Sequence, residues 1–284
     1  MMKTHSILTP LKRLRLTVLV DNVSLRRDLR GEHGFSALIE TERGRLLFDV
    51  GKSSRAVLKN AAALGVELSR VDAVALSHGH YDHTGGLAAV LEEAPGARLY
   101  LHPHTAARRW GHWRGFKKSI GMSRKNIAAA EGRSPVLVSE AVALPMGVAL
   151  SGSVPGPEAP GERNFTVEIA GKRLPDRFVD EMFVLADSAS GVVLVTGCCH
   201  RGLINTLQHA QEVSGGRPVR TVLGGLHLGR LSKVELDAVI AALQSAGTKE
   251  VIAGHCTGKR AVDYLKRHGS FAVRTFHVGF VRDW

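Results

Sequence analysis

The apolar positions of the first hundred residues alternate between the period of a strand and the period of a helix. Two apolar runs flank the polar turn Thr41-Glu42-Arg43-Gly44, which predicts a β-hairpin. Apolar residues three and four apart indicate helices, with Ser54 and Thr84 as the expected N-caps. The predicted elements are a hairpin over 35–48, helices over 54–64 and 84–91, and strands over 71–76 and 98–101.

The second half of the chain shows the same order of elements. It predicts a hairpin over 182–196, a helix over 203–213 and a strand over 219–223. Placing Gly44 on Gly191, an offset of 147 residues, superposes later positions without a gap, namely Leu76 with Leu223 and His80 with His227. This agreement in order and register indicates an internal duplication. Two β-rich halves with helices outside predict an α/β fold, a four-layer αββα sandwich whose strand ends meet along one edge.

Other segments depart from this regular pattern. Residues 98–133 lack clear periodicity and are expected to form a basic insert or lid within a single domain over 1–284. Residues 151–163 are rich in proline and glycine and are expected to form a loop. The chain closes with a predicted strand over 250–253, a helix through Arg267 and a strand over 271–278.

Composition describes a folded protein in a reducing compartment. Of 284 residues, 44% are hydrophobic and 23% charged, which excludes disorder, collagen-like repeats and a coiled coil. The N-terminal apolar run stops at Asp21, too early for a signal peptide, and no stretch reaches the ~18 apolar residues of a membrane span. Cys198, Cys199 and Cys256 are expected to be free thiols. We therefore expect a cytoplasmic protein with no membrane partner.

A dense histidine motif follows the predicted strand over 71–76. His78-x-His80-x-Asp82-His83 places three imidazoles and a carboxylate within six residues. Two ligands at i and i+2 reach one metal ion from an extended exit, while Asp82 and His83 face a neighbouring position. Imidazole and carboxylate suit Zn²⁺ at about 2.0–2.2 Å, and Mn²⁺, Fe²⁺ or Ni²⁺ are alternatives. One or two divalent metal ions, zinc first, are the expected cofactors.

This motif resembles that of the metallo-β-lactamase superfamily, whose fold is the duplicated αββα sandwich. The resemblance extends over nearly the whole chain. Within this superfamily the sequence most resembles one subfamily, which includes 7,8-dihydropterin-6-methyl-4-(β-D-ribofuranosyl)aminobenzene-5′-phosphate synthase. The segments that carry it are 19–22, 32–36, 77–87, 196–202, 224–228 and 255–258.

The resemblance implies two metal positions. The implied ligands are His78, His80 and His200 around one ion, and Asp82, His83 and His255 around a second. His200 and His255 each follow a predicted strand, so both are expected at the sheet edge that carries His78. Asp49, in Leu-Phe-Asp-Val-Gly, matches the acidic residue that supports the site from behind the ligands.

Two further positions carry open alternatives. Many relatives have a bridging aspartate where this chain has Cys198, which either bridges as a thiolate or is a small buried residue. His227 is expected to face the site as a ligand, a general acid or a substrate contact, unless it is a structural histidine. A metal ion would lower the pKa of bound water and polarise a carbonyl or phosphoryl oxygen. Asp82 would then orient the resulting hydroxide, and His227 would protonate the leaving group.

The charge points to an anionic substrate. The net charge is +12, and residues 98–133 carry nine basic residues against Glu131 alone, a net +8. Guanidinium and ammonium groups recognise phosphate, and tryptophan stacks on flat heterocycles. The expected substrate contacts are Arg108, Arg109, Arg114, Lys117 and Trp113. A solvated basic loop or an RNA-binding surface are the alternatives.

These observations favour a metal-dependent hydrolase that acts on an anionic, phosphorylated small molecule. The first alternative, implied by the resemblance, is a dihydropterin synthase reaction in which an aryl ribotide displaces diphosphate. The second is a metal-dependent nuclease or nucleic-acid-binding protein. Because the remaining 248 residues carry only +4, nucleic acid is not the expected partner. A homo-oligomer stays open.

Overall fold

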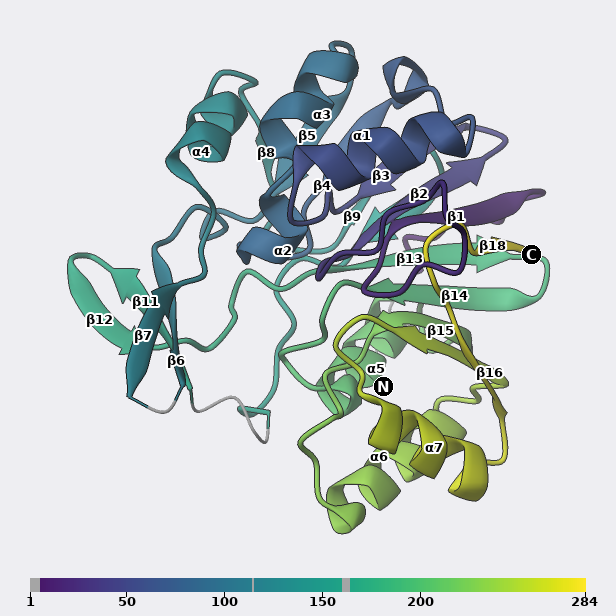
Figure 1. The fold of residues 1–284 in the computed structure, drawn as a ribbon. Coiled ribbons are helices and arrows are strands. Elements are labelled where there is room, and N and C mark those ends of the chain that lie inside the picture. Colours follow the sequence, from purple (N-terminus) through teal and green to yellow (C-terminus); the bar gives the residue numbers. More distant parts are fainter. Residues whose placement is uncertain (1–5, 114, 160–163) are drawn as a thin grey trace.

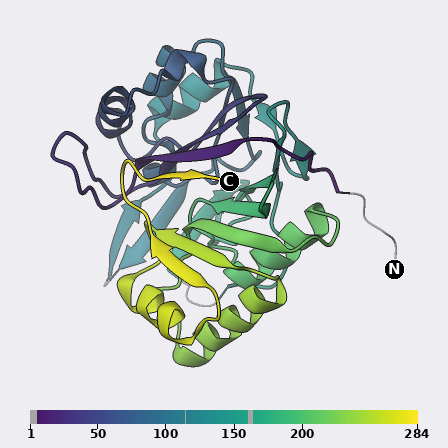
Figure 2. The same ribbon diagram turned by 90° about the vertical axis from the view of Figure 1, so that its right-hand side faces the viewer.

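A computed structural model describes residues 6–113, 115–159 and 164–284, and it shows four layers. Two β-sheets lie face to face, with α1, α3 and α4 outside one sheet and α5, α6 and α7 outside the other (Figure 1). The view turned by 90° shows the same order of helices, sheets and helices (Figure 2). The predicted αββα sandwich is confirmed.

The first sheet contains the predicted N-terminal hairpin and the strand that leads into the histidine motif. Its order is β18-β1-β2-β3-β4-β5-β8. β2 and β3 are antiparallel, whereas β3, β4, β5 and β8 run parallel. The bounds are β1 Leu14–Val20, β2 Ser36–Thr41, β3 Gly44–Phe48, β4 Ala73–Ala75, β5 Arg98–Leu101, β8 Val136–Leu137 and β18 Val281–Asp283.

The second sheet repeats this topology. Its order is β17-β16-β15-β14-β13-β10-β9, with an antiparallel β13–β14 hairpin followed by parallel β15, β16 and β17. Gly44 and Gly191 begin the second strand of the two hairpins, so the predicted duplication is confirmed in position as well as in order. The bounds are β9 Val142–Ala143, β10 Val148–Leu150, β13 Phe183–Ser188, β14 Gly191–Thr196, β15 Val219–Gly225, β16 Glu250–Gly254 and β17 Ala272–Thr275.

The helices agree with the apolar periodicity, but two predicted caps are wrong. Ser53, not Ser54, caps α1 by accepting from the Ala56 N–H. The Thr84 hydroxyl donates to the His80 carbonyl at 3.0 Å instead of capping α3. No helix in the described parts of the chain is long and apolar enough to cross a bilayer. The bounds are α1 Ser54–Ala63, η1 Leu68–Arg70, α2 Tyr81–Thr84, α3 Leu87–Glu93, α4 Arg124–Glu131, α5 Leu203–Val213, α6 Lys233–Ser245 and α7 Lys259–His268.

Three apolar clusters fill the spaces between the layers. One contains Val57 and Val90 between the first sheet and its helices, and one contains Phe35 and Phe48 between the two sheets. The third lies between the second sheet and α5, α6 and α7, where Leu236 is fully buried. Burial of each such side chain stabilises the fold by roughly 1.5–3 kcal/mol. Because the layers are tightly packed, the ends of the strands are held in fixed positions.

The structure divides the predicted basic insert over 98–133. β5 belongs to the first sheet, and the Asn126 side chain of α4 donates to the Thr84 carbonyl at 2.8 Å. Of the described strands and helices of this segment, only the hairpin of β6 and β7 leaves the main layers, and it pairs with a second hairpin from beyond residue 164. This third sheet has the order β12-β11-β6-β7. The bounds are β6 Arg109–Trp113, β7 Phe116–Ser119, β11 Phe165–Ile169 and β12 Lys172–Pro175.

Candidate metal centre

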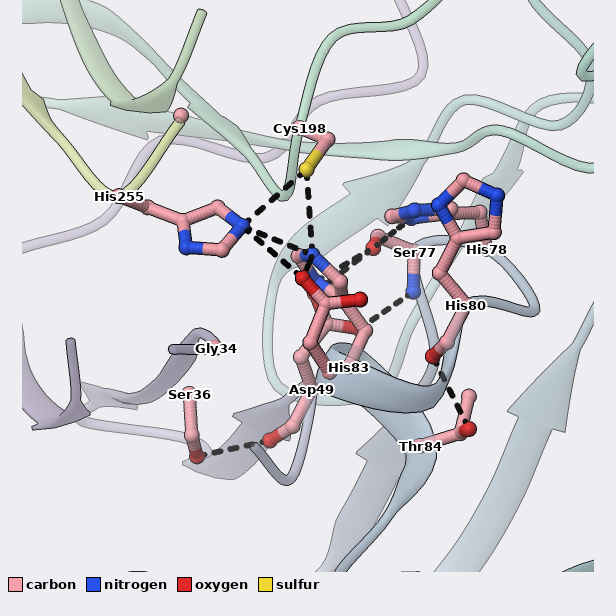
Figure 3. A network of polar contacts seen from close by, with 12 residues as sticks. Gly34, Ser36, Asp49, Ser77, His78, His80, His83, Thr84, Cys198 and His255 are labelled. Atoms are coloured by element: carbon pink, nitrogen blue, oxygen red, sulfur yellow. Dashed lines mark hydrogen bonds and ion pairs between the residues drawn. The ribbon is translucent and has the colours of Figure 1, made fainter. Parts of the chain in front are cut away.

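The carboxyl ends of the central parallel strands carry the candidate ligands. β4 leads into the loop with His78 and His80, β14 leads to Cys198 and His200, and β16 leads to His255. Since parallel strands end at the same edge, these side chains converge although they come from distant parts of the chain. Figure 3 shows His83, Cys198 and His255 in contact, beside His78 and His80.

His78, His80 and His200 form one group of imidazoles. The ring centroids lie 4.6 Å apart for His78 and His80, 4.8 Å for His80 and His200, and 5.0 Å for His78 and His200. The Nε2 atoms of His78 and His80 are buried and have no hydrogen-bond partner among the described residues. Burial lowers the pKa of both imidazoles well below the ordinary value, which keeps them neutral. Neutral imidazole is the form that binds a metal ion.

Asp82, His83, Cys198 and His255 form the second group. Their ligand atoms all lie within 4.8 Å of one another. Cys198 Sγ is 3.2 Å from the Nε2 atoms of both His83 and His255. Burial by itself would raise the pKa of Asp82, but its histidine neighbours, above all His83, lower it well below its usual range. The carboxylate is therefore ionised.

Asp49 orients His83 from behind. Its Oδ2 atom is 2.7 Å from His83 Nδ1, and it also accepts from the Ser77 hydroxyl at 2.7 Å. Burial by itself would lower the pKa of His83, whereas the carboxylates of Asp49 and Asp82 raise it to about 9. The contact with Nδ1 turns Nε2 towards Cys198, which is how carboxylates orient metal-binding histidines.

The donor set fits a divalent metal ion. The Nε2 atoms of His78 and His80, which have no partner among the described residues, lie beside a second group that contains an ionised carboxylate, two imidazoles and a thiol. Such mixed sets suit borderline cations. The Cys198 sulfur also lies within 4.8 Å of ligand atoms of His78 and His200, at the position where an aspartate bridge is expected from the resemblance. Burial raises the pKa of its thiol, so the proton stays on sulfur until a cation competes for it.

Two consecutive carboxylates hold the loops that carry these ligands. Asp180 Oδ2 accepts from the Gly79 N–H at 2.8 Å, between His78 and His80. Glu181 accepts from the backbone N–H groups of His200 at 2.5 Å and Arg201 at 2.6 Å. Our sequence reasoning missed both residues, and the only signal was a pair of acids just before a predicted strand. They connect the loops from the two halves of the fold.

Arg109 was predicted to contact substrate, and this is wrong. Its side chain is only 1% exposed and pairs with Asp176 at 3.0 Å and Asp180 at 2.8 Å. It also donates to the backbone carbonyls of Thr105 and His104. All of its donors serve the protein interior, so its charge is unavailable to a ligand.

Of the other predicted substrate contacts, Lys117 lies on β7 and Arg108 directly precedes β6. Arg173, which was not predicted, lies beside them on β12. Arg108, Lys117 and Arg173 place their cationic groups 5.4, 4.6 and 4.1 Å from the ring centre of Trp110. Three cationic side chains thus lie around the Trp110 ring. Arg114 lies outside the described residues, and the structure does not describe the side chain of Trp113.

A pocket of about 180 Å³ opens at the candidate ligands. His227 lines it, and its ring centre is 4.4 Å from that of His200. His33 also lines it and places Nε2 3.2 Å from Asp82 Oδ2. Three further lining residues give the walls an aromatic and cationic character: Tyr81, Phe165 and Arg230.

Comparison with known proteins agrees with this geometry. The sequence model of the metallo-beta-lactamase superfamily matches residues 29–178, more than half of the chain. The chain belongs to the metallo-beta-lactamase superfamily.

Its relatives include proteins with and without an assigned reaction. It is 30% identical to the uncharacterized protein MJ0448 of Methanocaldococcus jannaschii, over 93% of this chain and 98% of that protein. It is 27% identical to the 7,8-dihydropterin-6-methyl-4-(beta-D-ribofuranosyl)-aminobenzene-5'-phosphate synthase of the same organism, over 92% and 96%. The crystal structure of Tm1679, a metal-dependent hydrolase of the beta-lactamase superfamily, matches with a TM-score of 0.82 and 31% identity, over 95% and 98%. The expected likeness to the synthase subfamily is confirmed.

Proposed function

We propose that this protein is a metal-dependent hydrolase that cleaves a phosphorylated or otherwise anionic small molecule. The observation that carries the proposal is a cluster of six candidate ligands at one pocket. His80, Asp82, His200 and His255 line the pocket. The ring of His78 lies 4.6 Å from that of His80, and the ring of His83 lies 5.0 Å from that of His255. A divalent metal ion held by these residues would lower the pKa of bound water and polarise a phosphoryl or carbonyl oxygen.

The chain's own residues position the substrate and move protons. Asp82 lies at the pocket wall as an ionised acceptor, where it orients the attacking water. His227 lies on the opposite ligand group, beside His200, where its imidazole protonates the leaving oxygen. The Arg230 guanidinium lines the same pocket and pairs with the anionic group of the substrate.

An apolar cavity beside the pocket supports a substrate with an apolar group. This cavity of about 290 Å³ lies between α5 and α6, and His227 lines both it and the site pocket. Its other walls are mainly apolar and include Leu203, Leu226 and Val239. An aryl or alkyl leaving group would bury apolar surface in this cavity. Each Å² buried would contribute about 25 cal/mol to the free energy of binding. The favoured substrate class is therefore an aryl or alkyl phosphate.

The test uses the purified protein loaded with Zn²⁺ or Mn²⁺ and two phosphate esters, 4-nitrophenyl phosphate and glycerol phosphate. We expect turnover of both, with the higher kcat/KM for the aryl ester. His80→Ala and Asp82→Ala should each abolish turnover and lower the metal content. His268→Ala, an exposed histidine on α7, is the matched control and should change neither. Turnover that survives both site substitutions would refute the metal mechanism.

A second reaction is favoured by the relationship to the synthase. The similarity covers 92% of this chain and 96% of that enzyme, so the whole fold is shared. In that reaction an aryl ribotide displaces diphosphate from a pterin, and the apolar cavity would hold a flat ring. Incubation with dihydropterin diphosphate and the aryl ribotide separates the two proposals. Formation of the coupled product without cleavage of the esters would show that the protein is a transferase and not a hydrolase.

A further inference from the structure

A third group of ligand-type side chains lies beside the two groups already described. The ligand atoms of Cys198, His227 and Cys256 lie within 4.8 Å of one another. They follow the ends of three adjacent parallel strands, β14, β15 and β16. The Cys256 thiol points back at this edge, because it donates to the Cys198 carbonyl at 3.4 Å. All three residues line the site pocket.

The backbone presents Cys256 in the same way as His200. In each turn a residue with positive φ stands three positions before the N-cap glycine of the next helix, at Cys199 (φ 67°) and His255 (φ 50°). The glycines are Gly202 and Gly258, both with φ 83°. Two positions before the glycine stands His200 in one turn and Cys256 in the other. The second turn thus offers a thiol where the first offers an imidazole.

A glycine leaves room for this sulfur. A β-carbon at Gly225 would lie 2.4 Å from the Gly197 carbonyl oxygen, 2.8 Å from Cys256 Sγ and 3.1 Å from a ring carbon of His255. A separation under 3.0 Å is too close for real carbon contacts, so a larger residue at 225 would displace the thiol. The strand that ends at Gly225 therefore accommodates Cys256 in its present position.

We propose that Cys198, His227 and Cys256 bind an additional thiophilic metal ion in the wall of the pocket. With this ion bound, His227 is a ligand and no longer the acid of the proposed hydrolysis. Ligands about 2.0–2.3 Å from a tetrahedral zinc ion lie about 3.3–3.8 Å from one another. The ligand atoms of this group lie within 4.8 Å of one another, so side-chain shifts of up to about 1 Å bring them to these distances. Two sulfurs and one imidazole select softer ions than the set that includes Asp82. Three protein ligands leave a fourth position open to the pocket.

The site does not rest on the proposed hydrolase activity, and its test measures no turnover. Cd²⁺ alone is the probe, followed by the ultraviolet thiolate-to-cadmium charge-transfer absorption. Cys256→Ser should lower this absorption by about half, since one of two thiolate ligands is lost. Cys199→Ser is the matched control. Its sulfur lies 3.3 Å from the Thr206 hydroxyl within the core, so the absorption should stay at the wild-type level.

A second variant tests the proposal even if Cys256→Ser fails to fold. His227→Ala keeps both thiols and should weaken Cd²⁺ binding at this group by about tenfold or more. Unchanged charge-transfer absorption in Cys256→Ser, or unchanged Cd²⁺ affinity in His227→Ala, would overturn the proposal. Thiol titration of the purified protein should find Cys198 and Cys256 reduced, and a disulfide between them would equally overturn it.

Discussion

The buried cluster of Arg109, Asp176 and Asp180 offers a sharp test of how the metal loop is held. Both carboxylates pair with Arg109, at 3.0 Å for Asp176 and 2.8 Å for Asp180. Only Asp180 also accepts from Gly79, in the loop between His78 and His80. Asp176 instead accepts from the Phe178 N–H at 2.8 Å. Asp180→Asn and Asp176→Asn are therefore matched substitutions.

The two variants should lose similar stability but different metal affinity. Each weakens one buried bond to a charged partner, which lowers the free energy of unfolding by about 1.5–3 kcal/mol. Asp180→Asn also weakens the bond to Gly79, and loss of such a supporting contact lowers metal affinity by about 10–100-fold. That corresponds to about 1.4–2.8 kcal/mol of binding free energy. Asp176→Asn should bind metal with the wild-type affinity.

Two measurements separate these effects. Guanidinium denaturation of the metal-free proteins gives the free energy of unfolding, and competition with a chromophoric chelator gives the Zn²⁺ affinity. Equal losses of Zn²⁺ affinity in both variants would show that the whole cluster, not the Gly79 contact, matters. Wild-type affinity in Asp180→Asn would refute the role given to this carboxylate.

Three further outcomes follow from the same contacts. Arg109→Met leaves Asp176 and Asp180 without a cation, so guanidinium denaturation should show a loss of about 3–5 kcal/mol, and unchanged stability would contradict the buried ion pairs. Gly79→Ala places a β-carbon 2.1 Å from the Thr105 carbonyl oxygen, which should cost about 1–3 kcal/mol and reduce metal content. Gly96→Ala, which meets nothing within 4 Å, is its control. Removal of metal with dipicolinate should abolish hydrolysis and added Zn²⁺ or Mn²⁺ should restore it, whereas activity of the metal-free protein would exclude the proposed mechanism.

The sequence predicts the fold and the local part of the site because both follow from short-range patterns. His78 to His83 lie within six residues after a buried strand, so their spacing alone indicates a shared site. His200 and His255 required the inference that strand ends of both halves meet at one edge. The topology supports that inference, since the two sheets repeat the same strand order.

The remaining contacts join residues far apart in the chain. Asp180 reaches Gly79 across 101 residues, and Arg109 reaches Asp176 across 67. Charge alone does not distinguish a solvated arginine from one buried between carboxylates. The third sheet was missed because β7 and β12 are exposed along their whole length and show no alternation of apolar and polar positions.

The backbone locates the site independently of any ligand chemistry. Seven non-glycine residues in the described chain have positive φ, and four of them follow strand ends at this edge: Asp49, Cys199, His227 and His255. Such conformations cost about 1–3 kcal/mol each and persist only where surrounding contacts impose them. At His255 the backbone N–H donates to Asp21 at 2.9 Å, and at Asp49 the carboxylate accepts from the Ser77 N–H at 2.7 Å. Strain concentrated where the candidate ligands converge is the pattern expected of a functional site rather than of a structural edge.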